Sequence, residues 1–247
     1  MKKSNKKIYN IAVIPARGGS KSIPYKNITS LAGKPLIYYT IKAALASKLL
    51  DAVIVSTDDE KIAKVARSFG ADVPFLRPSE ISGDKALDIE FMGHAIKWLK
   101  ENRGWDPEIL INLRPTGPLR TAKDIDNVLE LMHKTGCDSV RTVSDPQQHN
   151  PFKMWYLKES GERMKPILPT KQFKKVGTDV PRQILPKVYW QNGLIDATRT
   201  KFIKKGRIYG PDIRGYVTEP WQSEDIDEPA DLLKVAAIMK EMKRKKK

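Results

Sequence analysis

The chain has 247 residues, of which 40% are hydrophobic, so it is long and apolar enough to bury a sizeable core. Its formal net charge is +16, but the first ten residues carry +4 and the last eight carry +5, which leaves a moderately basic body with Lys-rich ends. A single cysteine, Cys137, excludes an intrachain disulfide and a cysteine-based zinc site, and no run approaches the ~18 apolar residues of a membrane span.

The two ends contain almost only Lys as cations and lack the aromatic and Arg residues that a nucleic-acid surface groups on one face. We therefore expect no specific nucleic-acid partner and no membrane partner. The Lys-rich start is followed by an apolar run, 8–15, that is too short for a signal peptide. A cytoplasmic location is the expectation.

Short β-branched runs alternate with longer segments of helical period along the first 143 residues, a pattern typical of βαβ units and a mostly parallel sheet. In chain order, the pattern predicts strands at 8–14, 52–56, 73–76 (brief), 109–113 and 139–143. Apolar spacing predicts helices that include 37–45, 62–69, 89–99 and 125–133, and a last helix around 232–239. The expected fold class is an α/β sheet flanked by helices.

This rhythm stops in segment 144–187, which holds six Pro, several aromatic residues and many Lys. A structureless loop of that length is uncommon in a compact domain, so we interpret the segment as an inserted, β-rich arm that pairs with a second subunit. Strands are expected to return at 188–198 and 207–218. The α/β domain then comprises 8–143 and 188–244.

The stretch IPARGGSKSIPYKN, 14–27, follows the first expected strand, and ligands of open α/β sheets gather at the carboxyl ends of strands. Gly18 permits close approach of a phosphate, and Arg17, Lys21 and Lys26 supply positive charge. Neither the Walker A pattern nor G-x-G-x-x-G occurs. The residues alone leave two alternatives, a phosphate-binding loop and an exposed basic turn.

A second signal is SEDIDEPADL, 223–232, in which two carboxylates stand two residues apart. In an extended segment Asp225 and Asp227 share one face and can bind Mg²⁺ through oxygen. The alternative is that Asp227 or one of its neighbours caps the last helix, with Pro229 in its first turn. In STDDE, 56–60, the simplest interpretation is that Thr57 or Asp58 caps the following helix.

Six motifs in this order resemble the acylneuraminate cytidylyltransferase (CMP-N-acetylneuraminic acid synthetase) family: IPARGGSKSIPYKN, STDDE, LRPTGPLR, PRQILP, QNGLID and SEDIDEPADL. The resemblance spans nearly the whole chain, from about 11 to 233. It implies a nucleotide-diphospho-sugar transferase-like fold with a dimerisation arm, and a homodimer. It also implies Mg²⁺-dependent transfer of CMP from CTP to an acidic nine-carbon (nonulosonic) sugar, with release of pyrophosphate.

The resemblance also implies roles for particular residues, grouped here by ligand. Catalytic roles fall to Arg17, Lys21, Asp225 and Asp227, the last two of which are the metal ligands. Nucleotide binding falls to Ala16, Arg17, Gly18, Ser20, Lys21, Lys26, Asn27 and Arg77. Sugar binding falls to Arg114, Lys153, Arg182, Gln191 and Asn192, with Lys153 and Arg182 presented by the arm to a neighbouring subunit.

Two departures from the family pattern concern the sugar. Arg114 stands where the family commonly has Gln, and Trp190 and Gln191 stand where sialic acid enzymes often have Arg-Pro. Because a guanidinium cannot supply the acceptor of a Gln amide, the sugar is open among N-acetylneuraminate, legionaminate, pseudaminate and other acidic sugars. The alternative function is a related nucleotidyltransferase that uses another nucleotide or a sugar phosphate or phosphonate acceptor. A nucleic-acid-binding protein is the least favoured alternative.

Overall fold

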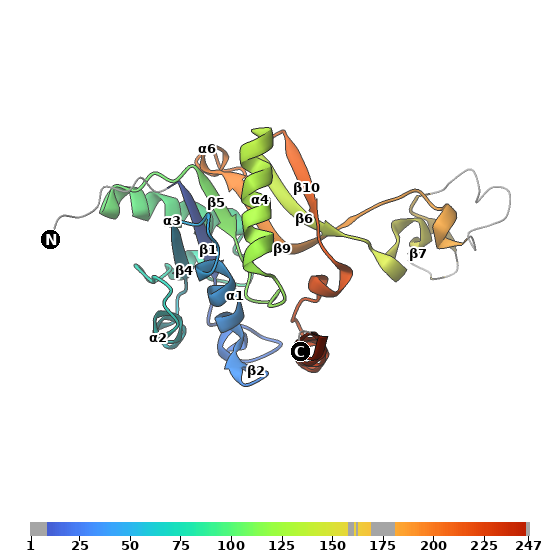
Figure 1. Ribbon diagram of the computed structural model, residues 1–247, viewed down its shortest axis with the longest axis horizontal. Coiled ribbons are helices and arrows are strands. Elements are labelled where there is room, and N and C mark those ends of the chain that lie inside the picture. The colour runs from blue at the N-terminus through green and yellow to red at the C-terminus, as the bar shows by residue number, and fades with distance from the viewer. Residues whose placement is uncertain (1–8, 158–160, 162, 169–180, 246–247) are drawn as a thin grey trace.

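The computed structural model describes residues 9–157, 161, 163–168 and 181–245, and its centre is a six-stranded sheet of order β10-β6-β9-β5-β1-β4 (Figure 1). The strands are β1 (Asn10–Pro15), β4 (Ala52–Ser56), β5 (Ile109–Asn112), β6 (Ser139–Ser144), β9 (Trp190–Arg199) and β10 (Ile213–Val217). β1 pairs in parallel with β4 and β5, and β10 pairs in parallel with β6. β9 lies between β5 and β6 and is antiparallel to both.

Helices cover both faces of this sheet. They are α1 (Leu36–Leu45), α2 (Glu60–Ser68), α3 (Asp88–Arg103), α4 (Ala122–Thr135), α6 (Thr200–Ile203) and α7 (Pro229–Lys245). The alternation of side chains in β1 shows why both faces are apolar. Ala12 and Ile14 contact the core formed with α1, α2 and α4, whereas Ile11 and Val13 contact the core formed with α3 and α6.

Short elements complete the chain. Two-residue strands β2 (Ser30–Leu31) and β3 (Lys34–Pro35) pair with each other just before α1. The 3-10 turns are η1 (Lys26–Ile28), η2 (Ser79–Ile81), η3 (Gln147–His149), η4 (Pro151–Lys153), η5 (Arg182–Ile184) and η6 (Pro220–Ser223). Within the residues that the structure describes, no helix is long and apolar enough to cross a membrane.

Most of the expected α/β elements are present, and two expectations were wrong in detail. No strand forms at 73–76, where the chain makes only single bridges, Ile54 with Asp72 and Thr57 with Leu76. The strand expected at 207–218 begins only at Ile213. The preceding residues instead follow α6 and end in Gly210, which packs so tightly against Phe202 and Asp138 that an added Cβ would lie 2.5 Å and 2.3 Å from them.

Part of segment 144–187 forms a small hairpin of β7 (Trp155–Leu157) and β8 (Met164–Pro166). β7 lies at the far end of the molecule from α3 (Figure 1). The segment is less rich in strands than expected, since its other described elements are the turns η3, η4 and η5. The stretch 169–180 lies outside the described residues.

Candidate active site

A cavity of about 500 Å³ opens where β1 and β5 end, at the carboxyl edge of the parallel strands. The structure brings eight of the residues expected from the sequence to its wall: Arg17, Ser20, Lys21, Lys26, Asn27, Arg77, Arg114 and Asp227. Two carboxylates that sequence reasoning missed, Asp84 and Asp88, also line it. The wall therefore combines five cations with three acidic groups.

The loop after β1 is held by its own polar contacts. Asn27, which is buried, donates from Nδ2 to the carbonyl oxygen of Arg17 at 2.9 Å and so closes the loop. The Gly18 N–H donates to the Asp58 carboxylate at 2.9 Å, and an added Cβ on Gly18 would lie 3.0 Å from Cβ of Asp59. A side chain at position 18 would therefore crowd the start of α2.

The start of α2 also corrects an expectation, because neither Thr57 nor Asp58 caps it. Asp59 is the N-cap residue, and its carboxylate accepts from the Ile62 N–H at 2.9 Å. Asp58 instead accepts from the Gly18 N–H of the loop. The motif STDDE thus fastens the basic loop to the sheet and caps a helix at the same time.

Two cations of the loop, Arg17 and Lys21, share the carboxylate of Asp84. Arg17 Nη1 lies 2.6 Å from Asp84 Oδ1, and Lys21 Nζ lies 2.5 Å from Asp84 Oδ2. Hydrogen bonds from Lys21 and Arg17 lower the pKa of Asp84 below its ordinary value. Asp84 lies between η2 and α3 and is an exposed residue, so the cations have a counter-ion that stays accessible to solvent and ligands.

A third apolar cluster brings the far end of the chain to the loop. Ile23 and Leu31, from the loop side, share this cluster with Ile226 and with Val235 of α7. Next to it, Lys26 Nζ donates to the Ile226 carbonyl and to Asp227 Oδ1, each at 2.9 Å. Two segments about 200 residues apart in the sequence therefore meet at one wall of the cavity.

The two candidate metal ligands flank the buried residue of this cluster. Ile226 is fully buried and its N–H donates to the Thr116 carbonyl at 2.9 Å, while Asp225 and Asp227 on either side are exposed. This alternation matches the expected extended geometry. Asp227 lines the cavity; Asp225 does not.

Asp227 itself does not cap α7, since among the described residues no hydrogen bond joins its carboxylate to an N–H of the first turn. Asp231 Oδ2 accepts from the N–H groups of Asp227 and Glu228, the two residues before α7, at 2.9 Å and 2.8 Å. These hydrogen bonds lower the pKa of Asp231 below its ordinary value. The carboxylate of Asp227 is left facing Lys26 and the cavity.

The donor set at this wall fits Mg²⁺. That ion prefers oxygen ligands and is usually held by one or two carboxylates together with water and substrate phosphates. Asp225 and Asp227 supply two such carboxylates beside a cationic cavity. No cluster of three or more potential metal ligands occurs within the described residues, so a site here would depend on oxygen atoms from the ligand.

Arg77 forms the floor of the cavity. It is buried, donates from Nε to Ser56 Oγ at 3.0 Å and from Nη2 to the Ser56 carbonyl at 2.6 Å, and lies over the Phe91 ring. Burial lowers the pKa of Arg77 to about 10, and nearby Asp58 and Asp88 act in the opposite direction. Its two donors, Nε and Nη2, hold Arg77 against the end of β4.

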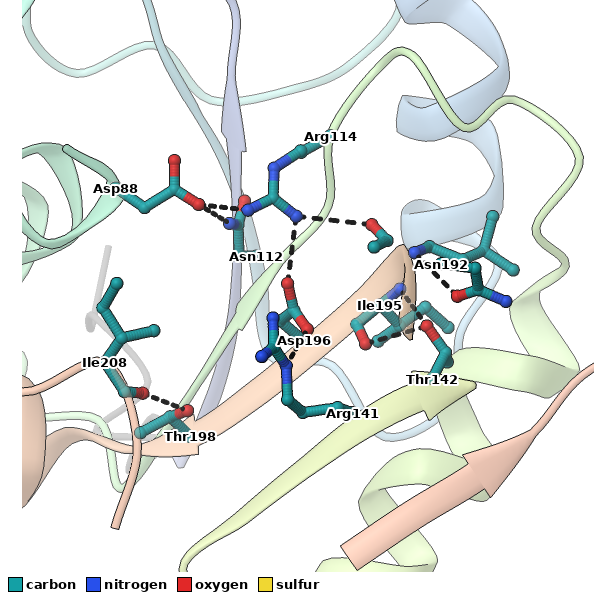
Figure 2. Close-up of polar contacts among 12 residues, drawn as sticks. Asp88, Asn112, Arg114, Arg141, Thr142, Asn192, Ile195, Asp196, Thr198 and Ile208 are labelled. Carbon is teal, nitrogen blue, oxygen red and sulfur yellow. Dashed lines mark hydrogen bonds and ion pairs between the residues drawn. The ribbon is translucent and has the colours of Figure 1, made fainter. Parts of the chain in front are cut away.

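Arg114 is paired on two sides (Figure 2). Its Nη1 donates to Asp196 Oδ2 at 2.9 Å, and its Nη2 donates to Asp88. Burial alone would lower the pKa of Arg114, but the two carboxylates outweigh it and raise the pKa above its ordinary value. The charge of Arg114 is therefore neutralised by carboxylates of the protein itself.

The sequence is similar to those of known cytidylyltransferases. The sequence profile described as "Cytidylyltransferase" matches residues 11–159, more than half of the chain. The N-acylneuraminate cytidylyltransferase of Escherichia coli O18:K1:H7 is 31% identical over 242 residues, which cover 96% of this chain and 53% of that protein. The chain belongs to the acylneuraminate cytidylyltransferase family.

Other relatives of this cytidylyltransferase agree with that assignment. The CMP-N,N'-diacetyllegionaminic acid synthase of Legionella pneumophila is 39% identical over 64% of this chain and 67% of that protein. A solved CMP:2-keto-3-deoxy-manno-octonic acid synthetase, in complex with CTP, superposes with a TM-score of 0.67 over 95% of this chain and 99% of that one. At 20% identity this likeness shows the shared fold. The chain spans about half the length of its Escherichia coli relative.

Several residues expected at the ligand lie elsewhere in this cytidylyltransferase. Asn192 donates from Nδ2 to Thr218 Oγ1 at 2.8 Å and to Ser223 Oγ at 3.0 Å, and so joins β9 to the segment after β10. Ala16 is fully buried, and its N–H donates to the Ser56 carbonyl at 2.9 Å. Both positions support the site without lining the cavity.

The remaining residues expected to bind the sugar belong to the arm and to the start of β9, where the chain re-enters the central sheet. Lys153 is exposed in η4, and Gln191 is exposed near the start of β9. Arg182 lies in η5, and its side chain is outside the described residues. Lys153 and Gln191 do not line the cavity of their own chain. The assignment of Lys153 and Arg182 to a neighbouring subunit's sugar site stays a prediction.

The two carboxylates missed from the sequence carry a weak signal. Asp84 and Asp88 lie four residues apart, between Arg77 and the helix expected to begin near residue 89. Acidic residues are common at a helix N-terminus, and that ordinary explanation accounts for both without a ligand. Only their contacts with Arg17, Lys21 and Arg114 show that Asp84 and Asp88 do more than an ordinary acidic residue at a helix N-terminus.

Proposed function

We propose that this cytidylyltransferase transfers CMP from CTP to a hydroxyl group of an acidic nonulosonic sugar and releases pyrophosphate. The observation that carries the proposal is the convergence of Arg17, Lys21 and Lys26 with Asp227 on one cavity wall at the end of β1. Three cations in this position suit a triphosphate, and the carboxylate suits its metal ion. The family membership and the names of the relatives support the same reaction.

The residues of the chain act in this reaction chiefly by positioning and by balancing charge. Arg17 and Lys21 bind the β- and γ-phosphates and stabilise the negative charge that builds up on the leaving pyrophosphate. Asp225 and Asp227 would hold Mg²⁺, which when bound supplies positive charge to the phosphate oxygens. The sugar hydroxyl attacks the α-phosphorus in line with the leaving group.

Binding of the triphosphate exchanges counter-ions within the cavity. Asp84 has to release Arg17 and Lys21 when phosphate oxygens replace its carboxylate. Lys26 likewise transfers from Asp227 to a phosphate oxygen, which frees the carboxylate of Asp227. The two exposed carboxylates therefore hold the cations in place before the nucleotide arrives.

The arm supports a homodimer as part of the proposal. Its described residues expose large apolar side chains, among them Tyr156, Leu157, Met164 and Ile184, each of which is more than half exposed. Tyr156, Leu157 and Met164 lie on the hairpin of β7 and β8, Ile184 lies in η5, and exposed apolar side chains of this kind are typical of an interface. Analytical ultracentrifugation tests this point: we expect a dimer, and a Leu157→Glu/Ile184→Glu variant should sediment as a monomer.

Pyrophosphate release tests the reaction directly. Purified protein with Mg²⁺, CTP and a panel of nonulosonic acids should release pyrophosphate with at least one acid. A panel in which no acid supports CTP-dependent release would overturn the proposal. Replacement of CTP by ATP, GTP or UTP separates it from the alternative of a nucleotidyltransferase with another nucleotide, because the proposal requires a strong preference for CTP.

Asp227→Asn tests the metal role. The substitution should reduce turnover by about 100-fold or more while the melting temperature stays close to that of the wild type. Asp212→Asn is the matched control, because it also removes an exposed carboxylate paired with a cation, Arg214, outside the cavity. Equal activity of the two variants would contradict the metal role.

A further inference from the structure

The charge of Arg114 is balanced inside the protein. Asp88, Arg114, Asp196 and Arg141 alternate in sign along one row, so the row as a whole is neutral (Figure 2). Arg114 Nη1 donates to Asp196 at 2.9 Å and approaches the Gly193 carbonyl at 3.4 Å, while Nη2 donates to Asp88. Both terminal nitrogens of its guanidinium are thus directed at protein acceptors.

The row is anchored in the sheet on the side away from the cavity. Asp196 belongs to β9, and only 3% of its side chain is exposed. Its Oδ1 accepts from Arg141 Nε of β6 at 3.0 Å, and the guanidinium of Arg141 lies 4.1 Å from the centre of the Tyr209 ring. Because its neighbours sit on paired strands, Asp196 holds Arg114 in one orientation.

At the cavity end of the row, Asp88 uses only one of its two oxygens. Its Oδ2 accepts from Asn112 Nδ2 at 3.0 Å and from Arg114. Its Oδ1 points away from both (Figure 2), and within the described residues it has no hydrogen-bond partner. Asp88 lines the cavity, so this oxygen is an acceptor available to a ligand.

The unpaired Oδ1 of Asp88 differs chemically from the cations that line the cavity. Arg17, Lys21 and Lys26 attract anions, whereas an ionised carboxylate only accepts hydrogen bonds and repels oxygen atoms that carry lone pairs. A site that offers an unpaired acceptor rejects a ligand that lacks the matching donor. Cytosine presents an amino group where uracil presents a carbonyl oxygen, and a sugar acid presents hydroxyl groups.

We infer that Arg114 is a positioning residue, fixed by Asp196, that orients the carboxylate of Asp88 so that its Oδ1 selects a ligand carrying an N–H or O–H donor. This inference rests on the proposed function, since it takes the cavity as a nucleotide and sugar site. It replaces the expected role of Arg114 as a direct sugar ligand. The donor has two possible sources, the amino group of the base and a hydroxyl of the sugar acid.

Three variants test the inference: Asp88→Asn, Arg114→Gln and the double variant. Asp88→Asn keeps the shape of the side chain and puts an amide in place of the carboxylate. We expect each single variant to lose about 10- to 100-fold in kcat/KM, as for one hydrogen bond to a charged group, and the double variant to lose no more than Asp88→Asn alone. Arg114→Lys should remain defective, because an ammonium cannot hold both carboxylates at once.

Two readouts separate the sources of the donor. If the base supplies it, calorimetric titration should show the preference for CTP over UTP falling in Asp88→Asn, with the KM of the sugar acid unchanged. If the sugar supplies it, that KM should rise and the nucleotide preference should persist. Arg103→Gln is the matched control, because it breaks an Arg–Asp pair with Asp72 outside the cavity.

The inference is overturned if Asp88→Asn keeps the wild-type kcat/KM and the wild-type preference for CTP, or if the losses of the two single variants add in full. Melting temperatures of all variants identify loss of folding. A measurement of nucleotide binding distinguishes failure of this inference from failure of the proposed function. A wild-type protein that binds no nucleotide contradicts the proposed function and the inference together, whereas a wild-type protein that binds CTP beside unaltered variants contradicts the inference alone.

Discussion

Two arginines line the same cavity and differ in how their charge is balanced. Arg17 and Arg114 have similar side-chain exposure, 35% and 32%. Arg17 pairs with Asp84, an exposed residue before α3, whereas Arg114 pairs with Asp88 and with Asp196 of β9, which is almost fully buried. The first ion pair can exchange with a ligand, and the second is part of the framework. Similar exposure of two cations thus does not imply similar roles.

The largest effect on stability should come from substitution of Asp196, the buried partner of Arg114. Asp196→Asn removes the charge that Arg114 and Arg141 share, and loss of one partner of a buried ion pair costs about 3 kcal/mol or more. Urea denaturation should show this loss in the free energy of unfolding. Asp84→Asn, which alters the exposed ion pair of Arg17, serves as the control and should leave the urea midpoint close to that of the wild type. Equal midpoints for the two variants would remove the distinction between framework and exchangeable pairs.

Arg17→Gln should have the next largest effect, on catalysis. The variant loses a charged donor to the triphosphate, which is expected to reduce kcat/KM for CTP about 10- to 100-fold. Its melting temperature should barely change, because Arg17 and Asp84 are both substantially exposed. Steady-state kinetics and thermal unfolding check the two parts. A variant with unchanged kcat/KM would show that the loop is a basic turn after all.

Asp84→Asn should change nucleotide binding in the opposite direction. Without its carboxylate, Arg17 and Lys21 no longer need to leave a counter-ion, so the KM for CTP should fall about two- to five-fold. The effect should shrink at high salt, where exposed ion pairs are screened. A rise in KM would instead mean that Asp84 contacts the nucleotide or its metal ion.

The smallest effect concerns His94, which lies in α3 and does not line the cavity. Burial, with Arg77 and Lys97 nearby, lowers the pKa of His94 below its ordinary value. In the unfolded chain this histidine titrates at about pH 6.5, so at pH values near and below 6.5 the unfolded chain binds more protons than the folded protein. Stability should fall as the pH drops through 6.5, and it should be regained as the pH rises.

His94→Phe tests this pH dependence. Its ring can keep the contact with Phe75, which meets His94 edge to face at 4.6 Å. Chemical denaturation between pH 5 and pH 8 should show a shallower loss of stability in the variant than in the wild type. The same slope in both proteins would contradict the assignment of this proton to His94.

Much of the sheet could be read from local patterns in the sequence. Continuous apolar runs rich in β-branched residues mark β1, β4 and β5, because each of these strands is buried on both faces. The same patterns gave no direction for β9, whose antiparallel pairing with β5 depends on a chain that returns from the arm. The stretch at 73–76 looks like a strand, but it makes single bridges because it runs along the edge of β4.

Residue types and spacing alone also determined the positions of the basic loop, 14–27, and of the pair Asp225 and Asp227, whose two-residue spacing puts both outside a buried Ile226. Only the tertiary structure decided how these groups are used. Arg17 meets Asp84 across 67 residues, and Arg114 meets Asp196 across 82. Local periodicity reports which face of an element is buried, whereas the partner of a charge is set by which distant elements the fold brings together.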